Sequence, residues 1–155
     1  MISCFFIGHR DAPSDIQEKL NDTVEYLARE CNVTEFVVEN HGNFNAMATV
    51  AVQRLKKLDI QVTALRLLCY FPGDKPMVLP RYFDDFYYPM ELFEVPDRYA
   101  IEKANHLMID QCDYLVAYVS RSGGNAARFL KRGLRLEKKG YLRVVNLADN
   151  QISTG

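Results

Sequence analysis

The chain has 155 residues, of which 48% are hydrophobic, so it is the size of one domain and can bury a substantial core. Its 19 Lys and Arg residues are balanced by 20 Asp and Glu residues, which excludes a global positive field that would attract nucleic acid or an anionic membrane. Residues 2–7 are too few, and lack the basic flank, for a signal peptide, and no later apolar run could span a bilayer, so we expect a cytoplasmic protein with no membrane partner.

The N-terminal segment predicts a strand followed by a helix. Residues 2–7 form a continuous apolar run that ends at Gly8, a pattern typical of a strand buried on both faces of a parallel sheet. Ser14 and Gln17 form a capping-box pattern at the start of a helix that we expect to run to about Cys31.

The same order of strand, turn and helix then repeats. Residues 35–39 predict a second strand, and the turn at residues 41–43 leads into a helix whose apolar residues recur at helical spacing as far as Leu58. Residues 60–70 contain a third strand. The alternation breaks at residues 70–99, which hold half of the aromatic residues of the chain and are punctuated by prolines.

The C-terminal part restores the alternation. A helix begins near Asp97, and a fourth buried strand covers residues 114–118. The next helix covers residues 125–139, with Gly140 in the position of a left-handed C-cap, and a last strand covers residues 142–147. This spacing predicts the α/β class, as a Rossmann-like three-layer sandwich of about five mainly parallel strands in the order 3-2-1-4-5 with helices on both faces.

We expect this single domain to extend over residues 1–149, with residues 70–99 as an aromatic, proline-rich insert and residues 150–155 as a tail. A long ordered loop is usually functional, so Tyr82, Tyr87 or Tyr88 would stack on a base as part of a lid. Exposed aromatic residues equally favour contact between two copies of the chain, which makes the insert a candidate surface for a homo-oligomer.

Two loops follow strands at the edge of the sheet where ligands bind in open parallel folds. One is Gly8-His9-Arg10, and the other contains Gly123-Gly124. Paired glycines let the backbone approach a ligand closely, and the free N–H groups at the start of a helix favour a phosphate, which Arg10 would also contact. In the alternative interpretation the glycines only form a tight turn and Arg10 pairs with a nearby acid.

A third loop, residues 40–45, adds side-chain amides that would bind ribose hydroxyls, although asparagine is also a common turn residue. The predicted ligand-binding residues are Gly8, His9, Arg10, Gly42, Asn43, Asn45, Asn105, Ser120, Ser122, Gly123, Gly124 and Asn125, with Tyr82 and Tyr87 from the insert.

The order of the motifs along nearly the whole chain resembles the YpsA-like branch of the SLOG superfamily. The motifs that carry the resemblance are Gly8-His9-Arg10, Gly42-Asn43-Phe44-Asn45, residues 96–101, 105–110 and 112–118, and Ser122-Gly123-Gly124. The superfamily includes the LOG phosphoribohydrolases and the DNA-processing protein DprA. The resemblance implies a Rossmann-like fold that binds a nucleotide or a related ligand.

The chain departs from these relatives at polar positions. LOG enzymes carry a Pro-Gly-Gly-x-Gly-Thr-x-x-Glu loop, whereas Ala127 stands here in place of the threonine and Leu130 in place of the glutamate. Ala104 stands where the YpsA-like pattern has arginine, and Asn45 stands where an aspartate is common. The resemblance therefore implies that the chain binds phosphate but lacks the glutamate that assists hydrolysis in LOG enzymes.

Hydrolysis of an N-glycosidic bond would need a carboxylate from another position. The candidates are Glu39, Asp84, Asp85, Glu91 and Glu94, each of which is more often a surface charge or a partner for arginine.

A basic helix face is the third candidate site. It would track the backbone of single-stranded DNA, but a solvated outer face is the commoner explanation, so we expect no nucleic-acid partner. Its residues are Arg128, Lys131, Arg132 and Arg135.

The cysteines and histidines are widely spaced and contain no Cys-x-x-Cys pair, so we expect free thiols, no metal site and no cofactor. The sequence thus predicts a domain that binds a nucleotide or an ADP-ribose-like small molecule as a sensor or accessory module, rather than an enzyme. The alternative is a LOG-type nucleoside 5'-monophosphate phosphoribohydrolase, and the third hypothesis is single-stranded DNA binding.

Overall fold

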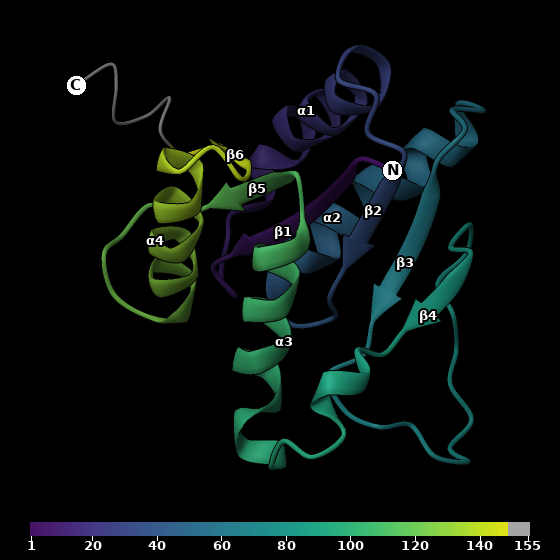
Figure 1. Ribbon diagram of the computed structural model, residues 1–155. Coiled ribbons are helices and arrows are strands. Elements are labelled where there is room, and N and C mark those ends of the chain that lie inside the picture. Colours follow the sequence, from purple (N-terminus) through teal and green to yellow (C-terminus); the bar gives the residue numbers. More distant parts are fainter. Residues whose placement is uncertain (149–155) are drawn as a thin grey trace.

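The computed structural model describes residues 1–148, which form one six-stranded sheet with helices on both faces (Figure 1). The strands are β1 (Ser3–Gly8), β2 (Glu35–Val38), β3 (Thr63–Leu67), β4 (Asp85–Tyr87), β5 (Tyr114–Tyr118) and β6 (Arg143–Asn146). All neighbours pair in parallel, in the order β4-β3-β2-β1-β5-β6. This confirms the Rossmann-like α/β class and the order of the five predicted strands. The predicted tail, residues 150–155, lies outside the described residues.

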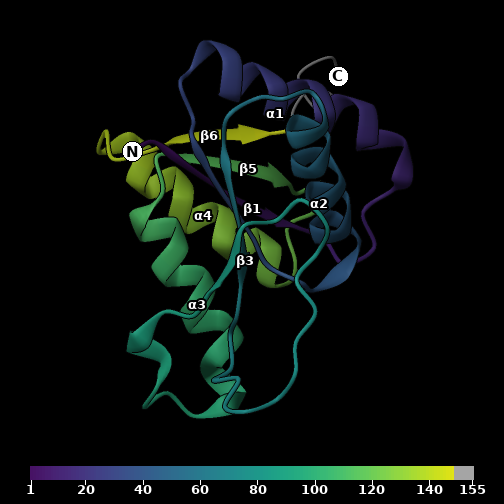
Figure 2. The same cartoon turned by 90° about the vertical axis from the view of Figure 1, so that its right-hand side faces the viewer.

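Two pairs of helices enclose the sheet. Helices α1 (Gln17–Glu30) and α2 (Gly42–Lys57) cover one face, and α3 (Asp97–Gln111) and α4 (Asn125–Lys138) cover the other (Figure 2). Successive residues of β1 point to opposite faces, so Phe6 packs in the core under α1 and α2 while Phe5 packs in the core under α3 and α4. The continuous apolar run of β1 is thus explained by burial on both sides.

The predicted capping box at the start of α1 is wrong. A short 3₁₀ turn, Ser14–Ile16, precedes the helix, and no side chain caps either element. The Gln17 amide donates instead to Asn21 Oδ1 at 2.9 Å and to the Met47 carbonyl at 3.0 Å. Gln17 therefore ties α1 to α2, because the extra turn moves it away from the capping position.

The aromatic insert contributes the edge strand β4, which the sequence did not predict. Leu67 pairs with Tyr87 across β3 and β4. The Asp84 carboxylate accepts the Ala64 N–H at 2.7 Å and contacts Lys56 Nζ, which fixes the start of β3 to the insert. A strand of only three residues between prolines gives too short a pattern to detect.

No helix among residues 1–148 is both long enough and apolar enough to cross a membrane.

Candidate functional site

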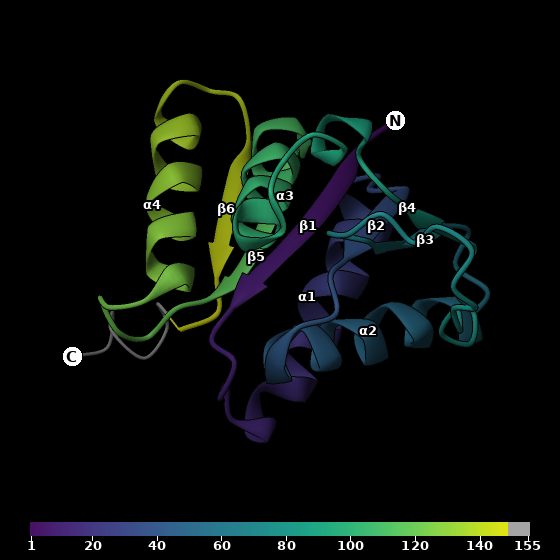
Figure 3. The same cartoon turned by 90° about the horizontal axis from the view of Figure 1, so that it is seen from below.

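A cleft of about 380 Å³ lies where β1, β2 and β5 end. The strand order reverses at β1, because β2, β3 and β4 lie on one side of it and β5 and β6 lie on the other. In Figure 3 the carboxyl end of β1 lies between the first turns of α2 and α4. This is the switch point at which ligands bind in open parallel folds. The predicted residues that line the cleft are Gly8, His9, Arg10, Asn45, Asn105, Gly123, Gly124 and Asn125.

A larger hollow of about 1060 Å³ lies near the amino ends of the strands, beside Ile2, Asp113 and Tyr141. Ligands of open parallel sheets bind at the carboxyl ends, so we take the smaller cleft as the candidate site.

His9 lies in the wall of the cleft and joins two of its loops. Its Nε2 atom accepts the Ser120 N–H at 3.0 Å, and its backbone N–H donates to the Tyr118 carbonyl at 3.3 Å. Burial, together with the charge of Arg121, lowers the pKa of His9 below its ordinary value. His9 is therefore a neutral acceptor that positions the loop after β5 against the loop after β1.

Gly8 and Gly42 permit close approaches that a side chain would block. A Cβ atom at Gly8 would lie 2.7 Å from Cβ of Phe44. Gly42 has a φ of +87°, and a Cβ atom there would lie 2.7 Å from Cα of Arg10. The Asn43 N–H donates to the Arg10 carbonyl at 2.8 Å, so Gly42 and Asn43 hold the loop of Arg10 in place without lining the cleft themselves.

Arg10 and Arg121 bring positive charge to the cleft. Arg121 pairs with Asp11, its Nη2 atom lying 2.9 Å from Oδ1. Arg10 is exposed and forms no ion pair among residues 1–148, so its predicted alternative role, as the partner of a nearby acid, is not observed. Its guanidinium is available to an anionic ligand.

The start of α4 lies beside these arginines. Gly124, with a φ of +93°, precedes the helix, no side chain caps it, and its first turn contains no acidic residue. A Cβ atom at Gly123 or Gly124 would meet no heavy atom within 4 Å. The first N–H groups of α4 therefore face open space at the cleft, where they favour an anion.

Asn45 and Glu39 form the buried end of the cleft, with 8% and 3% of their surfaces exposed. The Asn45 amide donates to Glu39 Oε2 at 3.2 Å and to the His41 carbonyl at 2.8 Å, which fixes its orientation. Asn45 Oδ1 is buried and accepts no hydrogen bond from the described part of the chain. A buried acceptor of this kind requires a donor, which a ligand hydroxyl would supply.

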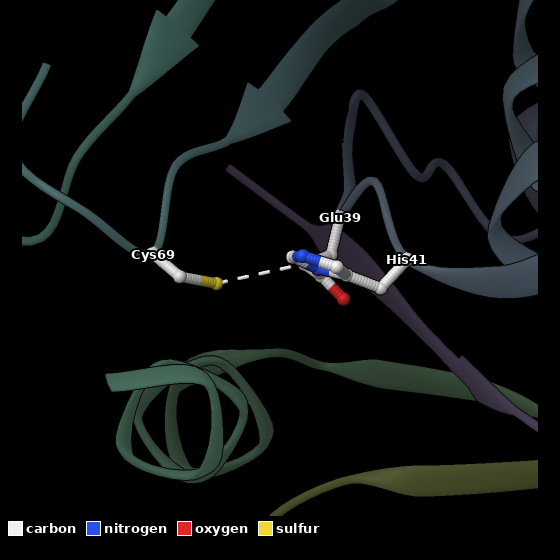
Figure 4. A group of neighbouring side chains, drawn as sticks. All are labelled: Glu39, His41 and Cys69. Atoms are coloured by element: carbon white, nitrogen blue, oxygen red, sulfur yellow. Dashed lines mark hydrogen bonds and ion pairs between the residues drawn. The ribbon is translucent and has the colours of Figure 1, made fainter. Parts of the chain in front are cut away.

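Glu39 also contacts His41 and Cys69, as Figure 4 shows. Its Oε1 atom contacts Nδ1 of His41 and lies 3.9 Å from Sγ of Cys69. Burial raises the pKa of the Cys69 thiol to about 12. Burial, together with the charge of Arg10, lowers the pKa of His41.

Several predicted residues lie outside the lining of the cleft. Ser120 contacts His9 through its backbone, and Ser122 is exposed on the same loop. Tyr82 lies against Lys57 and Arg81, and Tyr87 is part of β4. Neither tyrosine lines the cleft, so the structure does not bring the predicted lid residues to the site.

Of the five candidate acids, Glu39 is the one that lines the cleft. Asp84 is engaged with the start of β3, and Asp85, Glu91 and Glu94 are exposed. Besides Glu39, the lining residues that the sequence did not predict are Phe6, Ile7, His41, Ile101, Arg121, Ala126 and Phe129. The position of His41 and Arg121 just after buried strands is a signal that could have found them.

Two of the four residues of the basic face of α4, Arg128 and Arg132, contact other side chains of the domain. Arg132 forms two hydrogen bonds with Asp110 of α3, at 2.8 and 2.7 Å, and Arg128 contacts Asn125. Lys131 and Arg135 remain exposed.

No protein-family model matches the chain, and no curated protein matches its sequence. The resemblance to the SLOG superfamily therefore stays a prediction beyond the parallel α/β fold itself.

Proposed function

We propose that this chain binds a nucleotide, or an ADP-ribose-like compound, in the cleft at the carboxyl ends of β1, β2 and β5, and that it does so as a sensor or accessory domain. The observation that supports this most strongly is that one cleft combines a cationic end with a buried, unpartnered acceptor. These features suit a phosphate and a sugar hydroxyl, respectively.

The phosphate would bind at the end formed by Arg10 and the start of α4. The unpaired guanidinium of Arg10 can donate two hydrogen bonds to phosphate oxygens. The uncapped N–H groups of α4 add donors and the positive end of the helix dipole. Open space at Gly123 and Gly124 lets the ligand approach the backbone closely.

The sugar would bind at the other end, where Asn45 Oδ1 needs a donor. Ile101 of α3 and Phe129 of α4 add apolar side chains to the lining of the cleft. A volume of about 380 Å³ is within the range of small-molecule sites.

A thermal-shift screen tests the proposal. We expect AMP, ADP, ADP-ribose or NAD to raise the melting temperature in a concentration-dependent way, because a ligand that binds only the folded state stabilises it. Inorganic phosphate and free adenosine are the matched controls, and each should give a smaller shift than the complete ligand. The absence of any shift with phosphorylated ligands, including cyclic dinucleotides, would contradict the proposal.

Hydrolysis of the ligand is a second candidate function, and the position of Glu39 favours it. Its carboxylate lies in the lining of the cleft, 3.2 Å from the amide of Asn45, where it would stabilise the oxocarbenium-like sugar of an N-glycosidic cleavage. Chromatography of a long incubation with AMP would then detect free adenine, and Glu39→Gln would abolish its release without preventing the thermal shift. A shift without release of base would leave the chain as a binding domain.

A further inference from the structure

We infer that Glu39, His41 and Cys69 form a binding site for a Zn²⁺ ion at the wall of the cleft. Their ligand atoms, one from each side chain, all lie within 4.8 Å of one another. The three side chains differ in chemistry, and each supplies an atom that zinc binds in proteins.

The parallel pairing of β2 and β3 brings these residues together. Val38, the last residue of β2, pairs with Arg66 near the end of β3, so the chain leaves both strands at the same edge of the sheet. Glu39 and His41 follow β2 on alternate positions, and Cys69 follows β3 (Figure 4). Cys69 lies 28 residues or more from Glu39 and His41 along the chain, so only the fold brings the three side chains together.

The carboxylate of Glu39 is the second reason for the inference. It is 3% exposed, and its contacts are the imidazole of His41, the thiol of Cys69 and the amide of Asn45. A buried carboxyl group that keeps its charge is usually paired with a cation or binds a metal. Among residues 1–148, neither lysine nor arginine pairs with it.

Arg66, a buried arginine that contacts the backbone of Glu39, does not pair with its carboxylate. Its guanidinium donates to the backbone carbonyls of Val38 and Glu39, at 3.3 and 2.9 Å, and to Thr49 Oγ1 at 3.1 Å. It therefore binds the main chain that carries Glu39 and leaves the carboxylate charge to be balanced by a different cation.

The two oxygens of Glu39 have separate roles in this site. Oε2 accepts the Asn45 amide, and Oε1 faces His41 and Cys69. Asn45 thus orients the carboxylate so that one oxygen is directed at the metal position, as outer hydrogen bonds commonly do in zinc sites.

Sulfur, nitrogen and carboxylate oxygen together select zinc over calcium or magnesium, which prefer oxygen ligands alone. As the metal–sulfur bond forms, the thiol proton of Cys69 leaves to solvent. Three protein ligands leave a fourth tetrahedral position for water or for a group of the cleft ligand, since Glu39 and His41 also line the cleft.

Cobalt titration of the metal-stripped full chain tests the inference. Co²⁺ replaces Zn²⁺ in such sites and reports a thiolate ligand by a charge-transfer band in the near ultraviolet. We expect one equivalent of Co²⁺ to produce this band together with visible d–d bands, and Zn²⁺ to remove both. A chain that gives no thiolate band with Co²⁺ would overturn the inference.

Single substitutions assign the ligands. Cys69→Ser should remove the charge-transfer band, and Glu39→Gln and His41→Gln should each weaken Co²⁺ binding by at least about tenfold. Cys112→Ser is the matched control, because Cys112 is equally buried but lies in the core under α3 and α4. Persistence of the band in Cys69→Ser, or its loss in Cys112→Ser with a native circular-dichroism spectrum, would overturn the assignment.

Failure of this inference is distinguishable from failure of the proposed function. Gly123→Asp, at the phosphate end of the cleft, should lose nucleotide binding and keep the cobalt spectrum. Cobalt binding without any nucleotide-induced thermal shift would support the metal site alone, whereas a nucleotide-induced shift without cobalt binding would support the ligand site alone.

Discussion

Arg10 is the residue on which the phosphate end of the cleft most depends. Its backbone carbonyl accepts the Asn43 N–H at 2.8 Å, so its position is fixed by the main chain while its guanidinium stays exposed. The loop therefore holds the Arg10 guanidinium at the cleft, and the guanidinium forms no ion pair within residues 1–148.

Arg10→Ala should weaken the binding of ADP-ribose roughly ten- to hundredfold, because a hydrogen bond to a charged group contributes about 1.5–3 kcal/mol. The free energy of unfolding should change by no more than about 0.5 kcal/mol, since the side chain is exposed. Isothermal titration and urea denaturation measure the two quantities. Arg135→Ala, an exposed arginine of α4 outside the cleft, is the control; an equal loss of affinity in both variants would contradict the assignment.

The place of some residues in the fold follows from their position just after a buried strand. Gly8, Arg10, Gly123 and Gly124 are of this kind, and they line the cleft, while their binding of a ligand stays a prediction. The cluster of Glu39, His41 and Cys69 could not be predicted in this way, because Cys69 follows β3 whereas Glu39 and His41 follow β2. Their proximity depends on the register of β2 and β3, which the sequence does not specify by spacing.

At the scale of elements, the packing of α2 against β1 sets the floor of the cleft. Gly8 ends β1, and Phe44 in the first turn of α2 lies directly against it. Any side chain at this glycine would have to displace the ring of Phe44, which is 1% exposed and has little room to move.

Gly8→Ala should lower the free energy of unfolding by roughly 1–3 kcal/mol through overpacking. Urea denaturation measures the change. The same substitution at Gly123, where a Cβ atom meets nothing within 4 Å, is the control and should have an effect within about 0.5 kcal/mol. Equal effects at the two glycines would mean that the close contact with Phe44 does not exist in solution.

The ion pair between Asp110 and Arg132 joins α3 to α4 and predicts a pH dependence. The hydrogen bond from Arg132 holds the pKa of Asp110 below its ordinary value of 3.8. A lowered carboxyl pKa means that the stabilisation is present at neutral pH and is lost as the pH falls through the native-state pKa. Because both side chains are about one-third exposed or more, the effect should be under about 1 kcal/mol.

Asp110→Asn should therefore be less stable than the parent chain at pH 7, and the difference should shrink between about pH 5 and pH 3. Urea denaturation across this range, with the exposed Asp74→Asn as control, measures it. A difference that stays constant with pH would rule out the ion pair as its source.

Buried strands were easier to predict from the sequence than strands at the edge of the sheet. Strand β5 was predicted with its observed bounds because residues 114–118 are an uninterrupted apolar run. Strand β4 escaped prediction because it lies at the edge, is short and is flanked by prolines. The 3₁₀ turn before α1 escaped because its sequence also fits a capping box.

At the scale of the whole molecule, the insert of residues 70–99 exposes large apolar side chains that do not line the cleft. Its exposed large apolar residues are Tyr70, Phe71, Met77, Val78, Tyr82, Met90, Phe93 and Tyr99. Since neither Tyr82 nor Tyr87 lines the cleft, association between two copies is the role that we expect for this surface.

Sedimentation velocity at increasing protein concentration should show self-association of the chain. The double substitution Val78→Ser and Met90→Ser should weaken it without loss of stability, because these side chains are 93% and 70% exposed. Tyr141→Ser, at an exposed residue near the amino ends of the strands, is the control. A monomer at all concentrations would contradict this role.

Isothermal titration of ADP-ribose into Gly123→Asp and Gly123→Asn tests most directly whether a phosphate binds at the backbone of Gly123 and Gly124. The two side chains have nearly the same size, both fit the open space at Gly123, and only aspartate adds negative charge. We predict that Gly123→Asn retains measurable affinity while Gly123→Asp loses it, with both variants as stable as the parent chain. Equal affinity in the two variants would contradict a phosphate at this position.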